Sequence, residues 1–300
     1  MDESTLEKYR EAGRIAADAR KYGLTLIKEN ALLLDVATLI EARILEEGGG
    51  LAFPVNISVN EVSAHYTPRV NDDMVFNRGD VVKLDVGVHI DGYIADTAAT
   101  IEVGTNRYSA LIRASDEALR NAIDTLNKHA SLNDVGQVIE ETITSYGYKP
   151  INNLTGHSLR RYVLHAGVSV PNIRDSNMVM IKPKVDDVLA VEPFATDGAG
   201  YVVSGEGGNI FLYQGSLRSR FIHDKKLKRS AIILKDKFGT LPFAERWCST
   251  LLPSHGLVLK HLSAYGLLRH YPMLIEKGRG VVSQAEHTVI ITKDGCLVTT

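Results

Sequence analysis

VVKLDVGVHIDGYIADTAATIEV, residues 81–103, is the clearest fold signal in this chain. Two runs rich in apolar residues, 81–88 and 93–103, flank the turn pair Asp91-Gly92. An Asp-Gly pair between two such runs is a strong signal for a β-hairpin. We therefore expect two antiparallel strands joined by a short turn.

Two aspartates, Asp85 and Asp96, make this hairpin chemically unusual. If the hairpin folds symmetrically about Ile90 and Asp91, the two carboxylates face each other directly across the strands. Directly opposed like charges destabilise a sheet, so this arrangement requires a cation between them. A divalent metal is the natural candidate. The alternative is that the register slips and that both are ordinary surface carboxylates.

Composition places the chain among ordinary globular proteins. It has 300 residues, of which 44% are hydrophobic and 23% charged, and its net charge of −2 gives no overall attraction to nucleic acid or anionic membrane. Cys248 and Cys296 are too few for a disulfide framework. The first residues, MDESTLEKYREAG, lack an apolar signal region, and no window approaches 18 apolar residues. We expect a soluble, cytoplasmic protein that does not enter a membrane.

The order of the predicted elements indicates an α+β fold. Helices are expected at 4–29, after Asp35 as the N-cap, at 109–129, and at 131–146 with Ser131 at its start. Short strands are expected between 51 and 103, at 188–194, and near the end of the chain. Residues from about 209 to 275 interrupt this pattern with mixed, partly basic helical sequence. We expect one catalytic domain, 1–300, with an insertion at about 209–275.

Three further segments carry a potential metal ligand in an unusual setting: His157 after a glycine, Glu192 at the end of an apolar run, and Glu286 inside an apolar strand pattern. Taken singly, the histidine is more often a turn or core residue, and each glutamate is more often a strand-end charge that reaches water. Together with the two aspartates they form an oxygen-rich set with one imidazole. Such a set suits two divalent cations better than one, and paired metals activate water in hydrolases.

These segments resemble methionine aminopeptidases. The DVG and IADTA hairpin, the GHSL turn, the VEPF strand and the QAEHT strand occur in that family's order, from residue 51 to the end of the chain. The spacing between Glu192 and Glu286 resembles the type II subclass, in its archaeal-like form.

The resemblance implies the pita-bread fold, with two pseudo-symmetric halves around a metal centre and a helical insertion. It implies removal of the N-terminal methionine from peptides and nascent chains when the second residue is small. It further implies two divalent ions (Co, Mn, Fe or Zn). Asp96 and Glu286 would bridge them, Asp85 would bind one, and His157 and Glu192 the other. Glu192 would also accept a proton from the attacking water.

By the same resemblance, His65 and His165 are expected to support catalysis, since an imidazole can donate to an oxyanion or to the scissile amide. The alternative is that one of them is merely packed and hydrogen-bonded. The methionine pocket is expected to be walled by Phe53 and Tyr271, with His65, Leu164 and Ile210 nearby. Without the resemblance, Phe53 would be taken as a core residue. The other seven histidines receive no functional assignment.

The basic run at 218–237 has two interpretations. It could dock on ribosomal RNA, or it is the solvated face of the insertion, as surface charge runs usually are. We expect a monomer.

Two other functions stay open. One is a prolidase or proline-specific aminopeptidase on the same fold, and the other is a non-catalytic relative that binds RNA or protein. Relatives of the second kind have lost metal ligands, whereas all five positions are filled here.

Overall fold

The computed structural model describes residues 1–175 and 181–300, with the backbone alone at 218 and 219. Its helices agree closely with the sequence-based expectations. They are α1 (Glu3–Leu26), α2 (Leu33–Glu46), α3 (Ser109–Asn127), α4 (Leu132–Ser145), α5 (Lys225–Phe238) and α6 (His255–Ala264), with short 3-10 turns at Leu217–Phe221 and Glu245–Cys248. The start of α4 is confirmed in detail, because Ser131 and Asp134 form a reciprocal capping box.

The predicted N-cap of α2 was wrong. Asp35 lies in the first turn of the helix, and Leu32 takes the cap position without a side-chain hydrogen bond. The backbone N–H of Leu33 instead donates to the carbonyl of Met74 at 3.0 Å. A distant segment therefore satisfies a donor that a capping side chain would otherwise serve.

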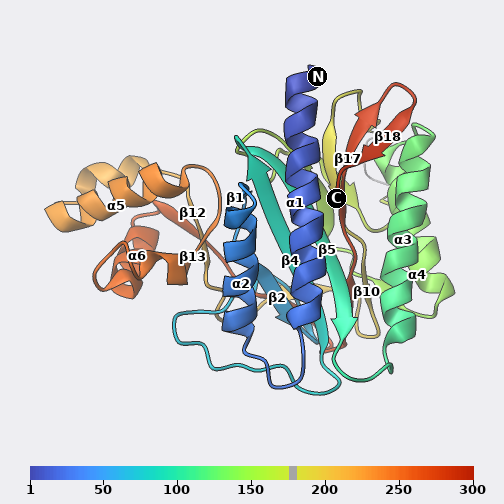
Figure 1. Ribbon diagram of the computed structural model, residues 1–300, viewed down its shortest axis with the longest axis horizontal. Coiled ribbons are helices and arrows are strands. Elements are labelled where there is room, and N and C mark those ends of the chain that lie inside the picture. Colours follow the sequence, from blue (N-terminus) through green and yellow to red (C-terminus); the bar gives the residue numbers. More distant parts are fainter. Residues whose placement is uncertain (176–180) are drawn as a thin grey trace.

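Two helix-covered sheets form the body of the molecule (Figure 1). Helices α1 and α2 pack on the first sheet and share one apolar core with it. Helices α3 and α4 pack on the second sheet with a separate core. The first sheet contains β1 (Gly50–Leu51), β2 (Asn56–Val59), β4 (Val81–Ile90) and β5 (Tyr93–Glu102), and the second has the order β18-β17-β9-β7-β8.

The remaining strands complete the second sheet and three smaller ones. Those of the second sheet are β7 (Thr155–Leu159), β8 (Ser169–Pro171), β9 (Val188–Val191), β17 (His287–Thr292) and β18 (Gly295–Val298). There are also two small sheets, β16-β10-β6 and β11-β15-β3, and the latter joins the halves by pairing β3 with β15. Their strands are β3 (Val62–Ala64), β6 (Lys149–Pro150), β10 (Phe194–Thr196), β11 (Val202–Ser204), β15 (Leu274–Glu276) and β16 (Val282–Gln284).

The hairpin at 81–103 is present, but its predicted register was wrong. Asp91 and Gly92 both have positive φ, 50° and 87°, and form a two-residue turn of the kind that matches strand twist. The strands therefore close at Ile90 opposite Tyr93, and Asp85 pairs with Ala98 while Asp96 pairs with Gly87. Asp85 and Asp96 are diagonal neighbours on one face of the sheet, not directly opposed.

Residues 210–271 form what we call the side lobe, which projects from the body at the left of Figure 1. It contains α5, α6 and a small sheet of β12 (Ile210–Tyr213), β13 (Phe243–Ala244) and β14 (Leu268–Tyr271) around its own apolar core. This lobe falls within the predicted insertion.

A buried ion pair fastens the side lobe to α2. Glu41 is 7% exposed and Arg246 8% exposed, and the guanidinium donates to one carboxylate oxygen while the Trp247 indole donates to the other at 2.8 Å. Arg246 also donates to Thr67 Oγ1 at 2.6 Å and to the Pro68 carbonyl at 2.9 Å.

Across the described ranges, no helix combines the length and apolarity needed to cross a bilayer.

Candidate metal centre

The five predicted metal ligands meet where the two halves of the body join. Asp85 and Asp96 extend from β4 and β5, and His157 from β7. Glu192 directly follows β9, and Glu286 lies between β16 and β17. The strands of the two halves are held together at this point, because the backbones of Glu286 and Ala98 exchange hydrogen bonds at 3.0 and 3.4 Å.

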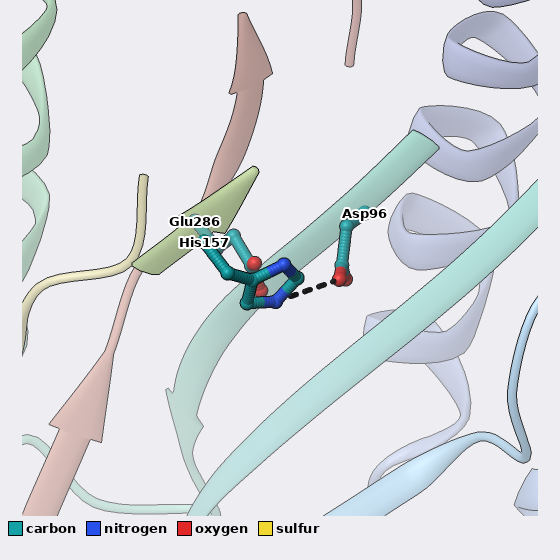
Figure 2. A group of neighbouring side chains, drawn as sticks. All are labelled: Asp96, His157 and Glu286. Atoms are coloured by element: carbon teal, nitrogen blue, oxygen red, sulfur yellow. Dashed lines mark ion pairs between the residues drawn. The ribbon is translucent and has the colours of Figure 1, made fainter. Parts of the chain in front are cut away.

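Figure 2 shows three of these side chains, Asp96, His157 and Glu286, pointing toward one another. His157 Nε2 lies 3.7 Å from Asp96 Oδ2 and 3.6 Å from Glu192 Oε1. Asp96, His157 and Glu286 each offer a ligand atom within 4.8 Å of the other two. Asp96 and Glu286 are buried, and the His157 and Glu192 side chains are each only 13% exposed.

The electrostatics of this cluster favour binding of a cation. Burial and then the neighbouring carboxylates raise the pKa values of Asp96, Glu192 and Glu286 well above normal. Burial also raises the pKa of Asp85 to about 7, although hydrogen bonds to Asp96 and Gln284 act in the opposite direction. Four adjacent carboxyl groups thus resist ionisation while no positive charge lies between them.

The donor set fits a divalent metal. Asp85 Oδ1 and Asp96 Oδ1 are buried without a hydrogen-bond partner, and unsatisfied polar atoms of this kind are costly unless a ligand engages them. His157 presents its Nε2 atom to the same carboxylate cluster, facing Asp96 and Glu192. Burial, followed by the charge of His165, lowers the pKa of His157 to about 3. Its imidazole is therefore neutral at ordinary pH, which is the form that coordinates metals.

A cavity of about 70 Å³ adjoins this cluster, and all eleven predicted site residues line it. The five ligand candidates are joined there by His65, His165, Phe53, Leu164, Ile210 and Tyr271. The last four are apolar or aromatic and each is at most 9% exposed. His165 is exposed and thus lies at the opening of the cavity.

Aromatic contacts fix the far wall of the cavity. The His65 and Tyr271 rings meet edge to face with centroids 5.3 Å apart, and the His165 ring stacks on Tyr271 at 6.4 Å. Tyr271 pairs with Ile210 across β14 and β12 of the side lobe. The side lobe therefore supplies two walls of a cavity whose ligand candidates all belong to the body.

The near wall depends on a glycine. A Cβ atom on Gly87 would lie 2.1 Å from the Phe53 ring, so only glycine lets this ring lie against β4. Gly87 is also the register partner of Asp96. Close backbone approach at this point places an aromatic wall directly beside a ligand candidate.

Sequence reasoning missed four residues at the site. Asn56, Ala64 and Pro242 line the cavity, and Gln284 Nε2 lies 3.5 Å from Glu192 Oε2 and 3.4 Å from Glu286 Oε2. The signal for Gln284 was present, since it belongs to the same QAEHT motif as Glu286. Asn56 offered a weaker signal, a polar residue between Val55 and Ile57.

Comparisons with known proteins agree with this geometry. The model of Metallopeptidase family M24 matches residues 7–293. A methionine aminopeptidase of Methanocaldococcus jannaschii is 44% identical over 300 residues, which covers 100% of both chains. The crystal structure of a methionine aminopeptidase from Thermotoga maritima has a TM-score of 0.73 at 23% identity and covers 100% of this chain and 98% of its own.

A prolidase from Pyrococcus furiosus also has this fold. Its TM-score is 0.63 at 17% identity, and the match covers 100% of this chain but 64% of the prolidase. Both structural likenesses concern the fold alone, and they confirm the predicted pita-bread architecture. The two helix-covered sheets that meet at the carboxylate cluster are its two halves.

Proposed function

Because this chain belongs to metallopeptidase family M24, we propose that it is a metal-dependent aminopeptidase that removes the N-terminal methionine from peptides and nascent proteins when the second residue is small. One observation carries the proposal. A chain that matches a methionine aminopeptidase from end to end also brings a buried Asp/His/Glu cluster to a cavity with apolar walls.

The five ligand candidates would hold two divalent ions, Co, Mn, Fe or Zn. Asp96 and Glu286 would bridge the pair, Asp85 would hold one ion, and His157 and Glu192 the other. Divalent metals supply Lewis acidity, which polarises a scissile carbonyl and lowers the pKa of water. The unpartnered buried oxygens of the two aspartates support this assignment.

Side chains of the protein would accept and donate the protons in the reaction. Glu192 would accept a proton from the attacking water at a carboxylate oxygen, because its side chain lines the cavity beside the other ligand candidates. Burial lowers the pKa of His65 to about 4, so its neutral ring still offers one N–H near pH 7. His65 and His165 would donate to the developing oxyanion and to the scissile amide.

Selectivity for methionine would come from the apolar walls. Phe53, Leu164, Ile210 and Tyr271 line the cavity, and a flexible thioether side chain packs well against such surfaces. The cavity is small, which suits a single residue at the end of a chain.

The test is hydrolysis of Met-Ala-Ser against an Ala-Pro peptide by purified protein, across a series of Co, Mn, Fe and Zn, with elemental analysis of the protein as isolated. We expect cleavage of the methionyl peptide and a stoichiometry of two metal ions. Cleavage of the Ala-Pro peptide alone would assign the protein to the prolidases. Tight RNA binding without turnover would favour the non-catalytic alternative.

We further propose a monomer that acts in the cytoplasm on nascent chains. The exposed basic side chains of α5 support contact with ribosomal RNA: Lys225, Lys226, Lys228, Arg229, Lys235 and Lys237. Co-sedimentation with ribosomes in rising salt tests this contact, because a phosphate-binding surface releases its partner as salt increases.

A further inference from the structure

Unpartnered polar atoms concentrate at the catalytic cavity. Nine buried side-chain nitrogen or oxygen atoms among the described residues lack a hydrogen-bond partner, and five of them belong to residues that line this cavity. Metal binding accounts for those of Asp85 and Asp96, and His65 has a proposed catalytic role. The atom of His157 is Nδ1, the ring nitrogen that does not face the carboxylates. The fifth atom, Asn56 Oδ1, has no assigned partner.

Asn56 lies beside Asp85. The two residues are Cα partners in the β2–β4 ladder, so their side chains extend from the same face with Cβ atoms about 4.5–5.5 Å apart. Asn56 is 5% exposed, and its Nδ2 donates to the carbonyl of Pro54 at 2.8 Å. Because a carbonyl oxygen only accepts, the amide nitrogen must face Pro54, and the amide oxygen is the atom left free.

An unpartnered amide oxygen requires a hydrogen-bond donor. Its neighbour Asp85 cannot supply this donor when ionised, because a carboxylate only accepts hydrogen bonds. The proposed metal ligands already place four carboxyl groups at this site. Asparagine adds a further acceptor there without a fifth negative charge. A polypeptide that enters by its N-terminus offers a matching donor, a free α-amino group with several N–H bonds.

We propose that Asn56 Oδ1 accepts a hydrogen bond from the free α-amino group of the substrate and so selects for an unblocked N-terminus. The inference rests on the proposed aminopeptidase function. The apolar walls would take the methionine side chain, while Asn56 would hold the amine on the β2–β4 side of the cavity, next to Asp85.

The experiment compares two competitive inhibitors of Met-Ala-Ser hydrolysis by the metal-loaded enzyme: L-methionine and its des-amino analogue, which differ only in the amine. Asn56→Ala should raise the inhibition constant of methionine about tenfold or more, since a hydrogen bond to a charged group has about this effect on binding. The constant for the des-amino analogue should change less than about twofold, because it never makes this bond.

Ser58→Ala is the matched control. Ser58 lies two residues further along β2, its buried hydroxyl also lacks a partner, and it does not line the cavity. Both inhibition constants should stay at their wild-type values in this variant. Metal content is measured in every variant.

Three results would overturn the inference. An equal rise for both inhibitors in Asn56→Ala would show that Asn56 only shapes the cavity. A loss of bound metal would make Asn56 a metal ligand. Wild-type enzyme that fails to cleave Met-Ala-Ser would reject the proposed function and this inference with it, whereas the first two results leave the function standing.

Discussion

Among the contacts between body and side lobe, the buried ion pair of Glu41 and Arg246 should contribute most to the free energy of unfolding. Glu41→Ala would leave three donors without their acceptor: the Arg246 guanidinium, the Trp247 indole at 2.8 Å and the Val55 N–H at 3.2 Å. Removing one partner of a buried ion pair costs about 3–5 kcal/mol, because the other charge stays buried and unpaired.

This cost converts to a measurable change in melting temperature. An unfolding entropy of about 2.1 cal/mol/K per residue gives about 0.6 kcal/mol/K for 300 residues. The midpoint of Glu41→Ala should therefore fall by about 5–8 °C. Thermal unfolding followed by circular dichroism, at one fixed metal concentration, measures this shift.

Glu46→Ala supplies the control, since Glu46 lies on the same helix and is exposed. It should shift the free energy of unfolding by less than about 0.5 kcal/mol. The double variant Glu41→Leu with Arg246→Met should recover part of the loss, because it removes both charges. If Glu41→Ala unfolded at the temperature of the control, the ion pair would not hold the lobe as described.

Three other predictions concern the site and its supports. Glu286→Ala should abolish peptide hydrolysis and lower the metal content while the far-ultraviolet dichroism stays unchanged; retained activity would remove Glu286 from the ligand set. Gly87→Ala should push the Phe53 ring out of place, raise KM for Met-Ala-Ser and cost about 1–3 kcal/mol of stability from overpacking. Glu276 is fully buried, which raises its pKa, but four backbone N–H donors outweigh burial and hold the pKa below its usual value. A carboxyl that is more acidic in the folded state stabilises above its unfolded pKa, and this stabilisation is lost as pH falls through the folded pKa. Glu276→Gln should therefore melt below wild type at pH 7, with a gap that narrows in acid; a gap independent of pH would contradict this.

The sequence indicated which residues are ligand candidates more accurately than it indicated how their strands pair. The DVG and IADTA strands formed the expected hairpin, and Asp85 and Asp96 share a face. Their direct opposition was wrong because the turn is centred on Asp91-Gly92, one residue later than assumed. A shift of this kind moves a strand by an even number of residues relative to its partner, so both side chains stay on the same face.

Tertiary contacts explain what the sequence could not reveal. Leu33 starts α2 because a carbonyl 41 positions further along the chain accepts from its N–H, and no local pattern encodes that contact. Asn56 is a polar residue in a short strand, a setting that usually indicates solvent exposure. It is nevertheless buried, because residues of the second half and of the side lobe line the same cavity.

The site draws its cavity walls and its ligand candidates from different parts of the fold, because the side lobe contributes only to the walls. Ile210 and Tyr271 face the cavity from the lobe, whereas every ligand candidate is anchored in the body. Substitutions at the lobe's attachment would therefore alter which terminal side chain fits and leave the reaction chemistry in place. An engineer seeking a new cleavage preference would begin with the lobe residues Ile210 and Tyr271.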